Sequence, residues 1–522
     1  MRRGVAPQQP LAPERPPFAT RLVLGLAAGF LLLHVVTNLV SPYGIHRDEF
    51  LYFAMGDHLR LWHMDFPPAI AILSVISRYL LGDSLAGLRA VPALAASGIV
   101  VLAALLAREL GGRRFAQGFA ALAVVACVFF QRAGNLFQPV ILDALWWTVG
   151  FYALARLCRG EGPARRWWLL LGLAGGIGLL TKFSILFFGF GVLMALLATP
   201  WRRALLGRWP YLALLIALAL GSPSIAGQIA LGWPLMGQMR ALQHGQLEHV
   251  SVAGFFLVQV MFGPAIFVGL GGLCALIVAP SMRPYRLLGW TCLWVWAPLV
   301  ALHGKAYYVG PTYPILFAAG AVALERLRAP RLGPALRWAA VGLTAAYGVL
   351  VLPLGVPIVA PAPLERYIHS IGAVEALRDN QGIIGRLPQD YADMLGWEDR
   401  AAAISSVYHG LSALERAKTV IIANNYGEAG ALEFFGPRYG LPSIVCAQGS
   451  FYFFGPGVRP GEVAITIGEG RDGLRRFYDS LEVAGHLTNP LTVREERDLT
   501  FYLGRGPRTT LQAIWPGEAG RY

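Results

Sequence analysis

RLVLGLAAGFLLLHVVTNLV, residues 21–40, is an apolar stretch long enough to cross a lipid bilayer. The acidic segment HRDE, residues 46–49, follows it within a few residues. Keeping two carboxylates so close to the end of a membrane span is costly. The position of Asp48 and Glu49 therefore calls for a functional reason, and we expect catalysis at the outer face of a membrane.

The composition of the whole chain supports a membrane location. Of the 522 residues, 56% are hydrophobic and only 14% are charged, and the mean hydropathy is +0.52. The strongly apolar stretches fill most of the first 355 residues, whereas the remainder reads as soluble sequence. These features predict a polytopic α-helical membrane protein with a C-terminal globular domain.

Hydropathy divides the membrane part into about eleven transmembrane helices. The expected spans are 21–40, 84–107, 115–131, 137–155, 167–181, 184–199, 209–228, 251–280, 287–303, 312–325 and 338–356. The expected domains are a proline-rich cytoplasmic tail over 1–20, a membrane domain over 21–360 with a first outer loop over 41–83, and a soluble α/β domain over 361–522.

The arginines indicate the orientation. The chain has a net charge of +14, but its arginines lie in short clusters between apolar segments rather than along one polar face. Most of these clusters fall on alternate connections, as expected when positive residues stay on the cytoplasmic side. This pattern predicts a cytoplasmic N-terminus, places Asp48 and the C-terminal domain outside, and gives no reason to expect a nucleic acid partner.

Several shorter elements are predicted outside the membrane. In the first loop, 49–55 and 70–76 are expected to form short helices that lie on the membrane surface. In the C-terminal domain, helices are expected over 401–417, 428–435 and 472–483, and strands over 419–423, 443–446, 463–467 and 499–503.

Four motifs occur in order along the membrane domain. They are HRDE at 46–49, DFPP at 65–68, QPVILD at 138–143 and GKAYYVGPTYP at 304–314. In this order they resemble the membrane glycosyltransferases related to protein O-mannosyltransferases and to the lipid A aminoarabinose transferase. YGEAGAL at 426–432 and GSFYFFGPG at 449–457 look like the outer domain of a bacterial branch of that family.

The resemblance implies the GT-C fold and an inverting transfer of a sugar from a polyprenyl-phosphate donor to an envelope acceptor. It matches Asp48 to the catalytic carboxylate, which would take the proton of an acceptor hydroxyl. Asp143 matches a second acidic position, and Glu49 is a further candidate. The alternatives are a salt bridge for Asp48, a solvent-facing role for Glu49 and a hydrogen bond between helices for Asp143.

A lipid-phosphate leaving group requires cations and hydroxyl donors. The candidates on the predicted outer side are Lys305, Tyr307, Tyr308, Lys182 and Arg240. Lysines and tyrosines at an interface are also ordinary membrane anchors.

The remaining candidates concern the first loop and the acceptor. Asp65 matches an acidic position of the family, but Phe66 stands where the lipid A transferases have a lysine, which puts the aminoarabinose reaction in doubt. His46 belongs to the same loop site. Glu428 is a candidate for acceptor selection, and its alternative role is to cap a helix. We expect no obligatory cofactor and leave a divalent metal open, because no histidine spacing defines a metal site.

The expected location is the bacterial inner membrane, with the active face outside. The expected partners are the lipid-linked donor and an acceptor that is lipid A, a polysaccharide, another lipid or a protein. Two other functions fit the span count or the lipid donor: a lipid or sugar transporter or flippase, and an oligosaccharide polymerase or ligase. Against transport, the charged residues gather at one membrane face rather than at the midplane.

Overall fold

The computed structural model describes residues 15–245 and 247–521. Contacts divide the chain into two units. The first contains the described part of Met1–Asn38 together with Arg89–Pro223 and Leu247–Val356. The second contains Leu39–Leu88, Ser224–Gln246 and Pro357–Tyr522. Of these, residues 246 and 522 lie outside the described part. The first loop thus groups with the C-terminal domain in one unit. The expected tail over 1–20 lies largely outside the described residues.

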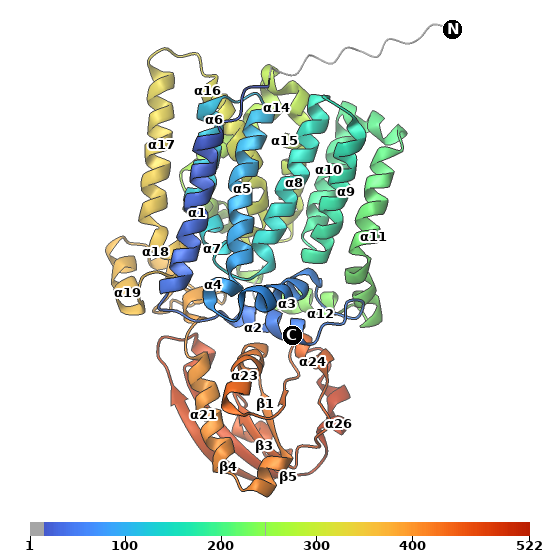
Figure 1. The fold of residues 1–522 in the computed structure, drawn as a ribbon, viewed down its shortest axis with the longest axis vertical. Helices are drawn as coiled ribbons and strands as arrows, with labels where there is room; N and C mark the ends of the chain where they lie inside the picture. Colours follow the sequence, from blue (N-terminus) through green and yellow to red (C-terminus); the bar gives the residue numbers. More distant parts are fainter. Residues whose placement is uncertain (1–14, 246, 522) are drawn as a thin grey trace. The chain divides into compact units, whose positions relative to one another are not determined.

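The first unit is built from long helices, of which α5, α8 and α9 run side by side (Figure 1). Its α-helices are α1 Thr20–Val40, α5 Ala90–Glu109, α6 Arg114–Ala126, α7 Val128–Ala133, α8 Pro139–Arg159, α9 Ala164–Thr181, α10 Ile185–Ala198, α11 Trp209–Ala230, α13 Val252–Met261, α14 Ala265–Val278, α15 Arg286–Ala301, α16 Tyr313–Glu325, α17 Leu332–Leu350 and α18 Leu352–Gly355. The last residues of α1 and α11 extend into the second unit. Four 3₁₀ helices complete it: η1 Pro200–Leu206, η2 Leu247–His249, η3 Pro280–Tyr285 and η4 Ala306–Thr312.

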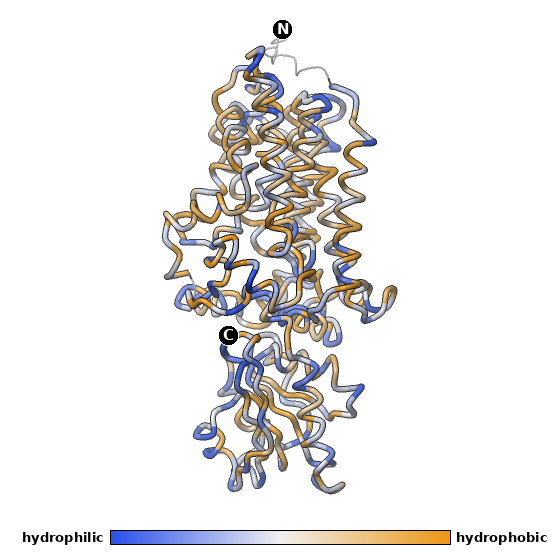
Figure 2. Tube along the Cα trace, turned by 90° about the vertical axis from the view of Figure 1, so that its left-hand side faces the viewer, coloured by the Kyte–Doolittle hydropathy of each residue, from blue (hydrophilic) through white to orange (hydrophobic). Residues whose placement is uncertain are grey.

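Small residues let some of these helices approach closely. A Cβ atom on Gly272 of α14 would lie 2.4 Å from the backbone nitrogen of Gly320 on α16. The two backbones are therefore in direct contact, as is common between helices in membranes. Figure 2 shows apolar residues along most of the length of these helices.

All eleven predicted spans are occupied by helix, but not all have the length and composition to cross a bilayer. Among the described residues, five helices meet both criteria: α1, α5, α8, α11 and the continuous η4–α16 segment. The number rises to seven if two bent pairs each count as one span. The predicted count of eleven and the predicted orientation therefore remain predictions.

The predicted span over 251–280 contains a sharp break. Residues 251–280 form α13 and α14, which meet at 114°. The break falls at Gly263, whose φ of +127° favours glycine, and at Pro264, which precedes the first residue of α14.

The second unit combines short helices with one sheet. Its α-helices are α2 Arg47–Asp57, α3 Ala69–Leu81, α4 Leu85–Leu88, α12 Pro234–Gly245, α19 Pro361–Ser370, α20 Gln389–Ala392, α21 Trp397–Gly410, α22 Ala413–Lys418, α23 Tyr426–Tyr439, α24 Ser450–Phe454, α25 Arg471–Leu474 and α26 Leu511–Ile514. Its 3₁₀ helices are η5 Val374–Leu377, η6 Arg494–Glu496 and η7 Trp515–Glu518. The two helices predicted in the first loop are confirmed as α2 and α3, and α2 packs against both α3 and α23.

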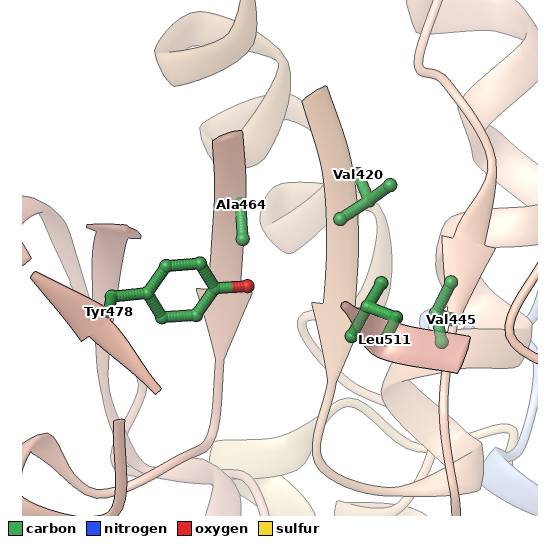
Figure 3. Packing of buried hydrophobic residues seen from close by; sticks show 5 residues of the cluster. All are labelled: Val420, Val445, Ala464, Tyr478 and Leu511. Carbon is green, nitrogen blue, oxygen red and sulfur yellow. The ribbon is translucent and has the colours of Figure 1, made fainter. Parts of the chain in front are cut away.

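The sheet has the strand order β2-β1-β3-β5-β4. Its strands are β1 Thr419–Ala423, β2 Ile444–Val445, β3 Val463–Ile467, β4 Tyr478–Thr488 and β5 Asp498–Pro507. β1 is parallel to β2 and β3, whereas β5 is antiparallel to β3 and β4. Figure 3 shows the apolar cluster on the sheet, which consists of Val420, Val445, Ala464, Tyr478 and Leu511. The predicted small C-terminal sheet domain is present.

The predicted helix over 472–483 is wrong. Only Arg471–Leu474 is helical, and Tyr478 begins β4, which pairs with β5. The ring of Tyr478 packs against Gly504, where an added Cβ would lie 2.7 Å from the ring carbon Cγ. Strand pairing and burial of this ring thus override the local helical preference.

Candidate active site

Helix α2 begins with a capping box that fixes the start of the acidic segment. His46 is the N-cap, and its Nδ1 accepts a hydrogen bond of 3.1 Å from the backbone nitrogen of Asp48. The carboxylate of Glu49 accepts a bond of 2.7 Å from the backbone nitrogen of His46. Both side chains are buried, so His46 and Glu49 build the helix terminus. Any chemical role for them remains a prediction.

The carboxylate of Asp48 meets a tyrosine of the C-terminal domain. The hydroxyl of Tyr426 donates a hydrogen bond of 2.8 Å to Oδ1 of Asp48. The guanidinium of Arg47 lies 4.8 Å from the centre of the Tyr426 ring and pairs at 3.2 Å with Glu495. Asp48 also lies in the first turn of α2, where the helix dipole favours a negative charge.

Two glycines allow α23 to approach α2 this closely. A Cβ on Gly427 would lie 2.5 Å from Cγ of Arg47, and a Cβ on Gly430 would lie 2.9 Å from the backbone carbonyl carbon of Phe50. The close packing of α23 against α2 therefore explains the two glycines in YGEAGAL, residues 426–432.

Gly430→Ala is expected to destabilise the second unit by about 1–3 kcal/mol, because the added methyl group meets backbone that cannot move aside cheaply. Gly436→Ala on the same helix is the control, since its Cβ would find only ordinary contacts at 3.4 Å or more. The apparent melting temperature measures both. Equal stability of the two variants would contradict the close approach.

Asp65 is another carboxylate of the first loop, and it is also held by the C-terminal domain. The hydroxyl of Ser450 donates a hydrogen bond of 2.8 Å to its Oδ2, and the side-chain amide of Gln238 donates one of 3.3 Å to the same oxygen. Burial raises the pKa of Asp65 to about 6, against the opposing effect of these hydrogen bonds. Asp65 is therefore a buried, oriented carboxylate rather than a solvent-facing one.

Asp393 provides a further carboxylate beside the start of α2. Its backbone carbonyl accepts a 3.0 Å hydrogen bond from the backbone nitrogen of Arg47. Burial raises the pKa of Asp393 to about 7, although the charges of His46 and Arg47 oppose this shift. The folded protein thus binds this proton more tightly than the unfolded chain does. This tighter proton binding adds to the free energy of unfolding. The contribution is fully present below about pH 4 and is lost as the pH rises through about 7.

Asp393→Asn is therefore expected to stabilise the protein at pH 8, by about 1–3 kcal/mol, and to reduce the fall in apparent melting temperature between pH 6 and pH 8. Asp399→Asn on α21 is the control, because Asp399 is exposed. An unchanged pH dependence in Asp393→Asn would show that this carboxyl does not bind its proton in that range.

The first unit holds a second polar group, around Asp143 on α8. Its Oδ1 accepts a hydrogen bond of 3.0 Å from Nε1 of Trp147, and its Oδ2 accepts one of 2.7 Å from the hydroxyl of Ser184. The charge of Lys182, which follows α9, interacts with this carboxylate. Asp143 is thus buried and paired.

Lys182 also lies close to two tyrosines of the GKAYYVGPTYP motif. Its ammonium lies 5.7 Å from the ring centre of Tyr307 and 5.3 Å from that of Tyr308. These two rings contact each other edge to face at 4.7 Å. The structure therefore assembles three of the five predicted phosphate ligands, one ammonium and two phenols, beside Asp143.

The other predicted residues are placed differently. Lys305 is the half-buried N-cap of η4, and Arg240 is exposed on α12 of the second unit. Glu428 is buried in a capping box at the start of α23, where it accepts a 2.9 Å bond from the backbone nitrogen of Asn424. Burial and the neighbouring Glu496 raise its pKa. Local structure accounts for Glu428, and its predicted contact with the acceptor remains untested.

The described residues contain no group of three or more His, Cys, Asp or Glu side chains that could hold a metal ion. The requirement for a metal therefore remains an open prediction.

Sequence reasoning missed Tyr426, Trp147 and Ser184 as partners of the acidic residues. The spacing of Asp143 and Trp147 could have predicted their contact, because residues i and i+4 share a helix face. Tyr426 was part of a quoted motif, but nothing in the motif connects it to a carboxylate 378 positions earlier.

Comparison with known proteins agrees with this architecture. Residues 65–226 match the family model described as dolichyl-phosphate-mannose-protein mannosyltransferase, which covers less than half of the chain. No curated protein sequence matches. The fold is that of the GT-C membrane glycosyltransferases, and the resemblance predicted from the sequence is confirmed.

Three solved structures illustrate the likeness. ArnT from Cupriavidus metallidurans in the apo state is 18% identical, with a TM-score of 0.59, over 92% of this chain and 98% of that chain. The same protein bound to undecaprenyl phosphate is 17% identical, with a TM-score of 0.58 and the same coverage. The Archaeoglobus fulgidus oligosaccharyltransferase tethered with an acceptor peptide is 12% identical, with a TM-score of 0.50, over 95% of this chain and 78% of that chain.

Proposed function

We propose that the protein is an inverting glycosyltransferase of the bacterial inner membrane. It moves a sugar from a polyprenyl-phosphate donor to an envelope acceptor at the outer face. The observation that carries this proposal is the group of Lys182, Tyr307 and Tyr308 beside Asp143. A cation kept among apolar helices is expensive, and it marks a functional site by default.

The chemistry of this group suits a lipid phosphate. An ammonium and two phenolic hydroxyls can stabilise the negative charge that develops on a departing phosphate. A polyprenyl donor is further supported by the family model and by the undecaprenyl phosphate bound to ArnT.

Asp48 supplies the base. Its carboxylate takes the proton of the acceptor hydroxyl while the hydroxyl oxygen forms a bond to the anomeric carbon. The bond from that carbon to the phosphate oxygen breaks, and its electron pair leaves with the polyprenyl phosphate. One displacement of this kind inverts the anomeric centre.

The test uses purified protein in vesicles with a panel of undecaprenyl-phosphate sugars and an envelope lipid and glycan extract. Mass spectrometry should find free undecaprenyl phosphate and a glycosylated acceptor, and the same product should be missing from cells that lack the protein. Movement of the donor across the vesicle with its sugar-phosphate bond intact would instead support a transporter.

A further inference from the structure

The C-terminal domain reaches the catalytic segment through one hydroxyl. Tyr426 is the first residue of α23, and its hydroxyl donates a 2.8 Å hydrogen bond to Oδ1 of Asp48. Both residues belong to the second unit. The contact joins the proposed base to a domain whose role the proposed reaction leaves unexplained.

The tyrosine is held from several sides. Its backbone nitrogen donates a 3.1 Å bond to Oε1 of Gln448, and the preceding Asn425 caps the helix by accepting from the backbone nitrogens of Gly427 and Glu428. Arg47 covers the ring at 4.8 Å and is itself fixed by Glu495. With this support the phenol cannot easily turn away from Asp48.

The chemistry of the contact limits what Tyr426 can do. Burial, and then the charge of Asp48, raise the pKa of the Tyr426 phenol well above its ordinary value. The phenol therefore keeps its proton and acts as a hydrogen-bond donor, not as a base. A donor fixed on one oxygen of a carboxylate orients that carboxylate, as preorganised catalytic groups require.

We propose that Tyr426 is the positioning residue for Asp48, so that the C-terminal domain completes the catalytic machinery on the first loop. This inference rests on the proposed function, because it assigns Tyr426 to the same proton transfer. It also gives the domain a role in turnover apart from any role in choosing the acceptor.

The test compares Tyr426→Phe with Tyr439→Phe, which removes a hydroxyl at the other end of α23. The Tyr439 hydroxyl lies 3.4 Å from the exposed carboxylate of Glu398. With the undecaprenyl-phosphate sugar that the wild-type protein consumes, Tyr426→Phe should lower kcat by about tenfold, without changing the KM for the donor or the melting temperature. Tyr439→Phe should behave as wild type.

A double variant separates positioning from packing. In Asp48→Asn, the added Tyr426→Phe change should cause no further loss, because two residues that act as one unit are not additive. A kcat of Tyr426→Phe equal to that of wild type would overturn the inference, as would an equal loss in Tyr439→Phe or full additivity with Asp48→Asn. If the wild-type protein consumes none of the donors, the proposed function fails, and the inference fails with it.

Discussion

Asp48→Asn is expected to lower kcat by about 10²–10⁴-fold, the range typical for the loss of a positioned general base. The amide has nearly the same shape as the carboxylate, and its oxygen can still accept the hydrogen bond from Tyr426. The capping box of His46 and Glu49 is untouched. The fold should therefore survive while proton removal from the acceptor hydroxyl is lost.

The control for this change is Asp57→Asn, at the other end of the same helix. Asp57 is exposed and pairs with Arg78 at 2.9 Å, so its loss removes a surface charge without touching the catalytic segment. Release of undecaprenyl phosphate, measured by mass spectrometry, should fall only in Asp48→Asn. Wild-type turnover in Asp48→Asn would rule out Asp48 as the base.

Lys182→Met carries the second large expected effect, a fall of about 10–100-fold in kcat/KM for the donor, equivalent to about 1.4–3 kcal/mol. Methionine keeps an apolar side chain of similar length but removes the ammonium that lies near Tyr307 and Tyr308. It also leaves the buried carboxylate of Asp143 without that charge. Binding of undecaprenyl phosphate, measured directly, should weaken in parallel.

Lys418→Met is the matched control, because the Lys418 side chain is exposed and pairs with the exposed Glu462. Its donor affinity should equal that of wild type. If Lys182→Met binds undecaprenyl phosphate as tightly as wild type does, the ammonium pairs only with Asp143, and the phosphate is held elsewhere.

Local pattern was sufficient for many elements. The strands β1 and β3 have the predicted bounds, and α2 and α3 lie where short apolar helices were expected. These segments owe their form to features that a short window contains, such as a buried apolar run or the prolines before α3. The prediction of a helix over residues 472–483 failed because the strand β4 forms only through pairing with β5.

The site shows the same division. Residue type and motif order singled out Asp48, Asp143, Lys182, Tyr307 and Tyr308, because charged groups near apolar spans are costly without a role and because the two tyrosines belong to a motif that resembles the family. They also singled out Glu49 and Glu428, which the structure places in capping boxes. A carboxylate that caps a helix and one that takes a proton look alike in sequence, and only their partners distinguish them.

By itself, the sequence determined an apolar helical protein with an acidic first loop, the GT-C resemblance and a small C-terminal domain, because hydropathy and motif order are written along the chain. Tertiary structure alone decided that Tyr426 meets Asp48, that Ser450 meets Asp65, and that Lys182 lies by two tyrosine rings. The physical reason is that hydrogen bonds and cation–π contacts act over a few ångströms of space. Residues hundreds of positions apart come within that range only when the chain folds.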